Sequence, residues 1–266
     1  MKKAFILGST GQDGSYMCEL LLKKKYKVYA LVRKSATGNT KHIDHLINNK
    51  KILDKSFFLV KGDLNDHSSI HNIISSVKPD EIYNFADQDH VGWSFYIPSY
   101  SLNTTSHSLI NILESIKSTD KNIKYFHPLS SNMFGQTNAK KQSETTPFNP
   151  QSVYAIGKVT CFHLSNLYRN AYNLKIYNTI FCNHESPRRS EEYVTKKIVK
   201  HVSEIYFKKR KTLELGDISA KIDWGYAKEY VEYAQKIMQT KKPDVYCVAT
   251  GKAHSVKEFA EKCFKY

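Results

Sequence analysis

The sequence predicts an α/β fold built on a doubly wound parallel sheet, and three observations support this. Short apolar segments alternate with amphipathic stretches from the first residue onward, which is the pattern of βαβ units. A glycine-rich turn follows the first apolar segment. The chain has 266 residues, 41% of them hydrophobic, which suffices for one such core and a small additional lobe.

The expected elements follow one another in βα order along the first two thirds of the chain. The segment at residues 3–7 is apolar and ends at a glycine, so it predicts a first strand rather than a signal peptide. Further strands are expected at residues 27–32, 57–61, 81–86, 125–129 and 174–181. Helices are expected at residues 14–25, 67–77, 102–118, 152–171 and 194–208.

Beyond residue 183 the alternation is less regular, and a basic segment occupies residues 188–211. The sequence therefore predicts a first domain at residues 1–182 and a smaller substrate-binding lobe at residues 183–266, interleaved with it. In the lobe we expect a strand at 213–215, a helix at 226–239, a strand at 245–248 and a helix at 255–264.

The composition argues against several classes of protein. The net charge of +15 could attract nucleic acid, but the basic residues are dispersed and the longest run is Lys23–Lys25, so we expect no nucleic-acid partner. No apolar run is long enough to cross a membrane, and we expect a soluble, cytoplasmic protein. The five cysteines are scattered without a C-x-x-C pair, which favours free thiols and no metal site.

The turn after the first strand carries the strongest local signal. It reads Gly8-Ser9-Thr10-Gly11-Gln12-Asp13-Gly14, and glycines at this spacing let a pyrophosphate approach backbone N–H groups at a helix N-terminus. An ordinary glycine-rich turn is the alternative. At a first βα junction the motif predicts a Rossmann-type fold and a dinucleotide site. The residues expected to bind the dinucleotide are Gly8, Thr10, Gly11, Gln12, Asp13 and Gly14.

The end of the second strand selects the dinucleotide. NAD sites usually place an acidic residue there, whereas this strand ends in Arg33, Lys34 and Ser35. Cations and a hydroxyl suit a 2′-phosphate, so we expect NADP as the cofactor, with Arg33 and Ser35 binding it; a solvated Arg-Lys pair is the alternative. Asp63 and Leu64 follow the third strand, where an adenine edge can be bound.

Tyr154 and Lys158 are four residues apart on an expected helix, so their side chains share one face. A cation beside a tyrosine lowers the tyrosine pKa, which lets the phenolate take a proton from an alcohol as hydride leaves. An ordinary Tyr/Lys helix pair is the alternative. Ser130 ends the fifth strand, where its hydroxyl can hydrogen-bond the substrate oxygen. Together these residues predict a redox site with catalytic Ser130, Tyr154 and Lys158.

These residues resemble the extended short-chain dehydrogenase/reductases and, within them, the GDP-mannose 4,6-dehydratase family. The similarity runs nearly from end to end of the chain. The motif Asn-His-Glu-Ser-Pro-Arg-Arg is especially specific. The similar stretches are residues 8–16, 32–46, 78–84, 88–95, 181–189 and 223–231.

The resemblance implies a reaction and a set of partners. The family enzyme, a lyase, oxidises C4 of a GDP-sugar, eliminates water across C5–C6 and returns the hydride to C6, with NADP regenerated in each cycle. It implies that Asn183, Arg188 and Lys197 hold the GDP-sugar, expected to be GDP-mannose. The segment at residues 33–45 resembles a loop that completes the NADP pocket across a subunit interface, so a homo-oligomer is expected.

The sequence departs from the family pattern at several positions. Asn132 stands where the family has the glutamate that removes the C5 proton, and an amide cannot act as a carboxylate base. Asp87 and Asp89 stand where alanine and a small hydroxyl residue are usual, and Ile222 replaces an arginine. The chain ends at Tyr266, tens of residues before a full-length member does, so the lobe is expected to be short.

Three functions are therefore compatible with the sequence. The first is a divergent dehydratase in which Asp89, or a water-mediated route, supplies the missing base. The second is a GDP-sugar C4 oxidase, epimerase or reductase that keeps only the redox half of the reaction, because Asn132 replaces the glutamate. The third is a catalytically idle paralogue that binds NADP or a partner subunit.

Overall fold

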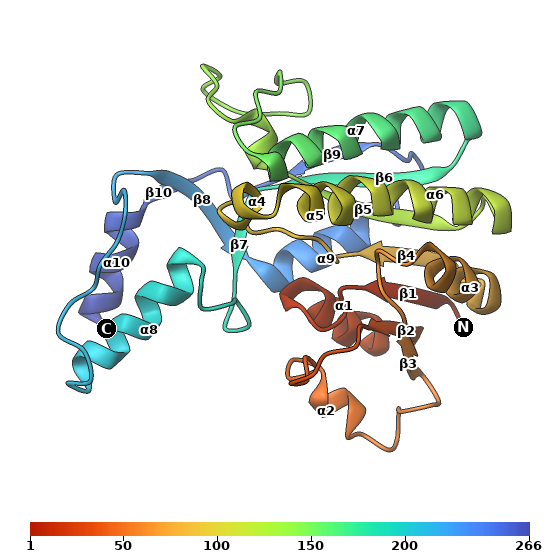
Figure 1. The fold of residues 1–266 in the computed structure, drawn as a ribbon, viewed down its shortest axis with the longest axis horizontal. Helices are drawn as coiled ribbons and strands as arrows, with labels where there is room; N and C mark the ends of the chain where they lie inside the picture. The colour runs from red at the N-terminus through yellow and green to blue at the C-terminus, as the bar shows by residue number, and fades with distance from the viewer.

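A computed structural model describes all residues from 1 to 266 and contains two sheets (Figure 1). The larger sheet has seven strands in the order β3-β2-β1-β4-β5-β6-β9, and every neighbouring pair is parallel. The doubly wound parallel sheet expected from the sequence is therefore confirmed. Its strands are β1 (Lys3–Leu7), β2 (Lys27–Val32), β3 (Phe57–Lys61), β4 (Glu81–Asn84), β5 (Lys124–Ser130), β6 (Lys175–Phe181) and β9 (Val245–Val248).

Helices cover both faces of this sheet because its central strands are apolar on both sides. Ala4 and Ile6 of β1 pack into one core with α1 and α9, whereas Phe5 and Leu7 pack into a second core with α3, α6 and α7. These helices are α1 (Gln12–Lys23), α3 (His67–Val77), α6 (Ser108–Thr119), α7 (Val153–Tyr172) and α9 (Ala227–Ile237).

Shorter helical segments connect these elements. A π-helical turn at Asn103–His107 joins α5 to α6, so the helix expected at 102–118 is irregular in its first turns. A 3-10 turn at Ser131–Phe134 follows β5. The short helices are α2 (Asp44–Ile47), α4 (Trp93–Tyr96) and α5 (Pro98–Leu102).

A second sheet of three strands lies at one end of the molecule, with α8 and α10 beside it (Figure 1, left). The residues at 213–215, expected as a strand, form no strand, because both edges of β8 are already paired with β7 and β10. The elements of this region are β7 (Asn183–Glu185), α8 (Val194–Tyr206), β8 (Lys221–Tyr226), β10 (Ala253–Ser255) and α10 (Val256–Lys265).

Residues 183–266 contribute to both sheets rather than to one separate lobe. After β8 the chain returns to the main sheet, where α9 packs against α1 and β9 pairs with β6. None of the helices combines the length and apolar character needed to cross a lipid bilayer.

A largely buried ion pair joins the two sheets at the glycine-rich turn. His184 of β7 lies 2.7 Å from Asp13 at the start of α1, and its other ring nitrogen lies 2.9 Å from the Cys182 carbonyl. Burial alone would lower the pKa of His184, but the Asp13 carboxylate outweighs it and raises that pKa. The ring also stacks on Tyr230, with ring centroids 4.6 Å apart. This contact fixes the small sheet against the edge of the main one.

Gly8 shows why the turn requires glycine, and it provides a test. Its φ is +74°, and a Cβ there would lie 2.4 Å from the backbone carbonyl of Phe85. Gly38 has a similar φ of +80° with open space around it.

The two glycines allow a test of this clash. Gly38→Ala should lower the free energy of unfolding by about 1–2 kcal/mol because of its left-handed backbone. Gly8→Ala should cost about 1–3 kcal/mol more, because a backbone clash is added. Urea unfolding of both variants measures the difference, and equal losses would contradict the clash.

Candidate active site

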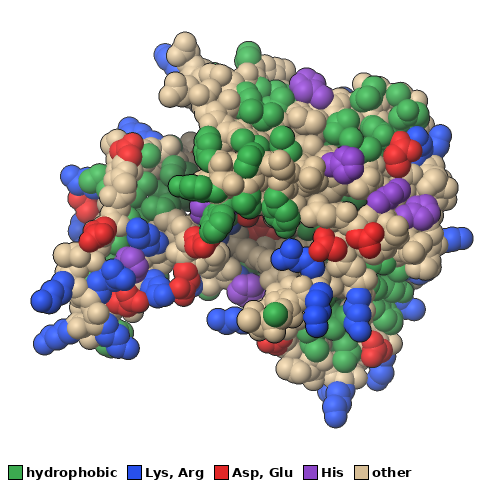
Figure 2. All heavy atoms as spheres, viewed as in Figure 1, with side chains coloured by type: hydrophobic (Ala, Val, Ile, Leu, Met, Phe, Trp, Pro, Cys, Tyr) green, Lys and Arg blue, Asp and Glu red, His purple; other side chains and the backbone are tan.

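A cavity of about 920 Å³ opens at the carboxyl ends of the central strands, between the main sheet and the small one. Figure 2 shows the molecule hollowed near the middle of this face, with charged and histidine side chains around the opening. The strand order reverses between β1 and β4, and this is the point where open α/β sheets form ligand crevices. A smaller cavity of about 260 Å³ adjoins it and shares Thr10, Gly11 and Asp87 with it.

The glycine-rich turn separates the two cavities. Thr10 and Gly11 line both of them, Gly8 lines the smaller, and Gln12 and Asp13 line the larger. Gly14 lines neither. It brings α1 close to the turn instead, because a Cβ on it would lie 2.1 Å from the Gly8 carbonyl oxygen. The turn therefore lies at the start of α1, where the motif predicts that a pyrophosphate binds.

Most of the residues expected around the adenosine end of a dinucleotide line the smaller cavity. Arg33, Asp63 and Leu64 line it, whereas Ser35 does not. Ser35 lies two residues beyond Arg33, where the chain no longer continues β2, which ends at Val32. Other polar residues that sequence reasoning missed are Asn39, Asn65, Tyr100 and Thr104.

Arg33 is exposed and is suited to a phosphate. Its guanidinium makes one long hydrogen bond, 3.5 Å from the Tyr100 hydroxyl. Tyr100 comes from α5, far from any glycine or Tyr-x-x-x-Lys motif, so nothing in the local sequence identifies it. Asn65 follows Asp63 and Leu64 directly, and its position after a strand was the available signal.

The larger cavity brings Ser130, Asn132, Tyr154 and Lys158 together. Ser130 is the last residue of β5, and its Oγ accepts hydrogen bonds from the backbone N and the side-chain amide of Asn132, at 3.2 and 3.1 Å. Ser152 caps α7 by accepting from the Ala155 N–H at 3.1 Å, which places Tyr154 in the first turn. The Lys158 ammonium lies 5.8 Å from the centre of the Tyr154 ring.

Lys158 is buried, and two of the three N–H donors of its ammonium have partners. Its ammonium donates to the Pro128 carbonyl at 2.6 Å and pairs with the Asp87 carboxylate. Burial raises the pKa of Tyr154 to about 12, although Lys158 acts in the opposite direction. Asp87 was noted in the sequence only as a departure from the family pattern, and its contact with Lys158 was not foreseen.

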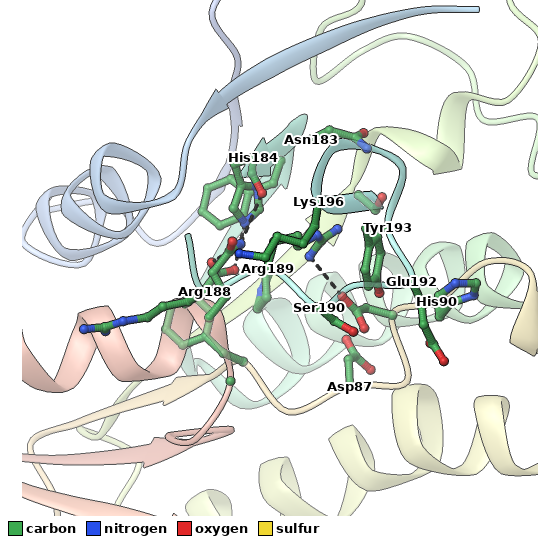
Figure 3. Close-up of a pocket in the computed structure, with 18 of the residues that line it drawn as sticks. Asp87, His90, Asn183, His184, Arg188, Arg189, Ser190, Glu192, Tyr193 and Lys196 are labelled. Atoms are coloured by element: carbon green, nitrogen blue, oxygen red, sulfur yellow. Dashed lines mark hydrogen bonds and ion pairs between the residues drawn. The ribbon is translucent and has the colours of Figure 1, made fainter. Parts of the chain in front are cut away.

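The residues expected to hold a GDP-sugar differ in their placement. Asn183 and Arg188 line the cavity, but the Arg188 guanidinium stacks 4.0 Å above the Tyr16 ring and pairs with Glu19. In Figure 3 its side chain extends away from the other labelled residues, toward α1.

Lys197 does not line the cavity, and its neighbour Lys196 does. Successive side chains on a helix point about 100° apart around its axis. The sequence therefore identified the basic segment but not which of its lysines faces the cavity. The Lys196 ammonium donates to the Pro187 carbonyl at 2.9 Å. Lys41 lines the same part of the cavity, and burial together with the charges of Arg188, Lys41 and Lys196 lowers the pKa of His42. This basic end of the cavity suits a diphosphate.

Arg189 lies at the centre of the cavity wall (Figure 3). Its guanidinium stacks 3.4 Å above the Tyr193 ring and lies 3.2 Å from the Glu185 carboxylate and 3.6 Å from that of Asp89. The side chain of Asp89 is 54% exposed, so this carboxylate faces the cavity. Arg189 is the last residue of the Asn-His-Glu-Ser-Pro-Arg-Arg motif, and the sequence alone does not indicate its function.

Comparison with known proteins agrees with this arrangement. Residues 5–266 match the family described as GDP-mannose 4,6 dehydratase. GDP-mannose 4,6 dehydratase of Drosophila melanogaster is 42% identical over 100% of this chain and 68% of its own length. The proteins of that name from Homo sapiens and Vibrio cholerae are 40% and 39% identical over 98% of this chain, covering 71% and 70% of their own lengths.

Solved structures share the fold at lower sequence identity. A dTDP-glucose 4,6-dehydratase from Bacillus anthracis in complex with NAD has a TM-score of 0.86 at 20% identity, covering 100% of this chain and 81% of its own. A UDP-glucose 4-epimerase from Thermus thermophilus, also with NAD, has a TM-score of 0.83 at 20% identity, covering 99% and 82%. With a match across almost its full length and about 40% identity to these relatives, the chain belongs to the GDP-mannose 4,6-dehydratase family.

Proposed function

We propose that the protein binds NADP and converts GDP-mannose by oxidation at C4, loss of water across C5–C6 and return of the hydride to C6. The convergence of Ser130, Tyr154 and Lys158 on one cavity beside the glycine-rich turn is the observation that carries this proposal. Family membership and the basic end of the cavity, formed by Lys41, Arg188 and Lys196, support the choice of a GDP-sugar.

The protein's own residues would handle protons in the redox half of the reaction. The glycine-rich turn would hold the dinucleotide, which would supply hydride acceptance at C4 and hydride return at C6. Tyr154 takes the proton of the C4 hydroxyl, and Ser130 hydrogen-bonds the same oxygen. The Asn132 amide donates to Ser130 at 3.1 Å, which leaves the serine hydroxyl hydrogen free to point toward substrate.

Removal of the C5 proton requires a carboxylate other than the one the family has at position 132. Two aspartates line the cavity after β4, and they differ in accessibility. Asp87 is 11% exposed and paired with Lys158, whereas Asp89 is 54% exposed in the wall. Of these two we propose Asp89 as the base, because its carboxylate can meet a sugar without breaking the buried Asp87–Lys158 pair.

A redox-only enzyme is the second candidate, and Asn132 favours it. The amide sits beside Ser130, where the family glutamate is expected, and it cannot take a proton. Under this alternative the protein oxidises or epimerises C4 without losing water.

The identity of the carboxylate base can be tested by weighing the product from GDP-mannose by mass spectrometry. Asp89→Asn should lower formation of the product lacking one water by about 10²–10⁴-fold, the usual cost of removing a general base. Asn132→Glu should restore that product in the Asp89→Asn background. Tyr154→Phe is the control and should stop both dehydration and C4 oxidation. Unchanged dehydration by Asp89→Asn would exclude Asp89 as the base, and oxidation without water loss by the wild type would establish the redox-only alternative.

The choice of NADP over NAD can be tested at Arg33. Arg33→Met removes the cation that lines the smaller cavity, and we expect NADP affinity to fall by about 10–100-fold with NAD affinity unchanged. Lys34→Met is the matched control, because Lys34 is adjacent and exposed but does not line the cavity. Fluorescence titration of both dinucleotides gives the affinities. Equal losses for NADP and NAD would contradict 2′-phosphate recognition by Arg33.

We also propose that the protein forms a homo-oligomer. Large apolar side chains are exposed along α4 and α7, including Phe95 at 60%, Ile156 at 48% and Leu167 at 57%. Light scattering of the NADP-bound protein should give a mass at least twice that of one chain. Ile156→Lys should lower it, and a monomeric wild type would refute the proposal.

A further inference from the structure

The segment after β4 carries a buried carboxylate that is directed at the active-site lysine. Asp87 lies three residues beyond the end of β4, at the carboxyl edge of the sheet, in a turn fixed by a 3.0 Å hydrogen bond from the Ala86 N–H to the Asn84 side chain. Its side chain is 11% exposed and that of Lys158 is 3% exposed. The two charges are therefore paired almost completely out of water.

The surroundings of this pair hold Lys158 on two sides but leave one oxygen of Asp87 without a partner. Lys158 uses one donor on the Pro128 carbonyl and another on Asp87 Oδ2. Asp87 Oδ1 and the Thr105 hydroxyl are both buried without a hydrogen-bond partner, and Thr105 belongs to the π-helical turn that precedes α6. The Cys161 thiol donates to the Thr105 carbonyl at 3.4 Å, so α7 fixes that turn as well.

We propose that Asp87 is a positioning residue that neutralises Lys158 and thereby keeps Tyr154 protonated, so that the first proton transfer is favoured only at alkaline pH. A lone ammonium near a phenol favours the phenolate. Here the ammonium is 5.8 Å from the ring centre and is already paired with a carboxylate, so the net charge near Tyr154 is close to zero. The raised pKa of Tyr154 agrees with this geometry: burial raises it, Lys158 lowers it, and Asp87 and Asp89 raise it further.

Neighbouring groups on β5 and α7 do not have the same effect on Tyr154 as Asp87. Ser130 lowers the pKa of Tyr154, so it acts in the opposite direction to Asp87. His127 is buried, and its pKa is well below its ordinary value, which leaves it neutral. Burial raises the pKa of Cys161 to about 12, so it too is neutral near pH 7. The groups facing this pair are Lys158 and Cys161 from α7, Asp87 and Asp89 after β4, His127 and Ser130 from β5, and Tyr193 before α8.

The test measures ionisation of Tyr154 directly, in the protein without substrate. Tyrosinate absorbance is recorded after a rapid pH jump, before alkaline unfolding, and the signal of the matching Tyr154→Phe variant is subtracted to isolate this one tyrosine. We expect Asp87→Asn and Asp87→Ala each to lower its midpoint by about one to two pH units, because the charge of Lys158 is then unopposed. Asp87→Glu should retain the wild-type midpoint, and Asp120→Asn, a change at an exposed carboxylate at the end of α6, should not move it.

Two variants keep the test decisive if one of them is unstable. Asp87→Asn preserves volume and still offers Lys158 a carbonyl acceptor, so it should fold even if Asp87→Ala does not. A midpoint that stays at the wild-type value in Asp87→Asn overturns the proposal. A lowered midpoint supports it.

The consequence for catalysis rests on the proposed function and has its own measurement. The rise of the hydride-transfer rate with pH, measured with GDP-mannose, should move to lower pH in Asp87→Asn by the same amount as the tyrosinate midpoint. If the midpoint falls while no variant oxidises any GDP-sugar, the tuning by Asp87 stands and the proposed function fails. If hydride transfer occurs but neither its pH profile nor the tyrosinate midpoint changes on removal of Asp87, the tuning is refuted and the proposed function stands.

Discussion

The rest of the structure depends on the close approach of the two segments that follow β1 and β4, at the point where the strand order of the main sheet reverses. The turn after β1 passes so near the backbone after β4 that no side chain fits at Gly8. This contact leaves α1 and the segment after β4 on opposite sides of a crevice, because the strand order reverses between β1 and β4. The two cavities that share Thr10 and Asp87 occupy that crevice.

The small sheet completes the crevice, and its position depends on a single polar contact with the same turn. Cys182 alone separates β6 from β7, so the main sheet continues almost directly into the small one. His184 then pairs with Asp13 and stacks on Tyr230, whose ring leaves no space for a side chain at Gly225. Burying an ion pair is costly unless both partners are fully bonded, and the carbonyl of Cys182 occupies the remaining ring nitrogen. The glycine turn therefore positions both the cofactor side and the substrate side of the cavity.

Local sequence patterns predicted the parts of the fold and site that depend on interactions between residues close together in the chain. The strands β1, β2, β3 and β9 have the expected bounds, because each is a short apolar segment with clear ends. The strand β8 was missed because Asp223 and Gly225 interrupt its pattern, and its pairing partners lie elsewhere in the chain.

Contacts between distant segments set the limits of prediction within the site. The spacing of Tyr154 and Lys158 predicted that they share a helix face, and both line the cavity. The pairs Asp87–Lys158 and Asp13–His184 join residues 71 and 171 positions apart, and no local pattern encodes them. Lys197 and Lys196 show the same limit on a smaller scale. The composition of the basic segment predicted a cation at the cavity, but the sequence does not show which face of α8 points toward the cavity.

The placement of carboxylates around the active-site lysine decides what chemistry this family member can perform. A single ammonium about 6 Å from a phenol stabilises the phenolate by about 3 kcal/mol at an effective dielectric constant of 20, or roughly two pKa units. A carboxylate in contact with that ammonium turns the charge into a dipole, whose effect falls off more steeply with distance. Compared with the pattern the family resemblance implies, this chain has exchanged a carboxylate at Asn132 for two after β4, at Asp87 and Asp89. Because Asp87 is buried against Lys158 and Asp89 is open to the cavity, the two carboxylates have different surroundings, and we assign them different roles: the first acts on the acidity of Tyr154, and the second faces the sugar.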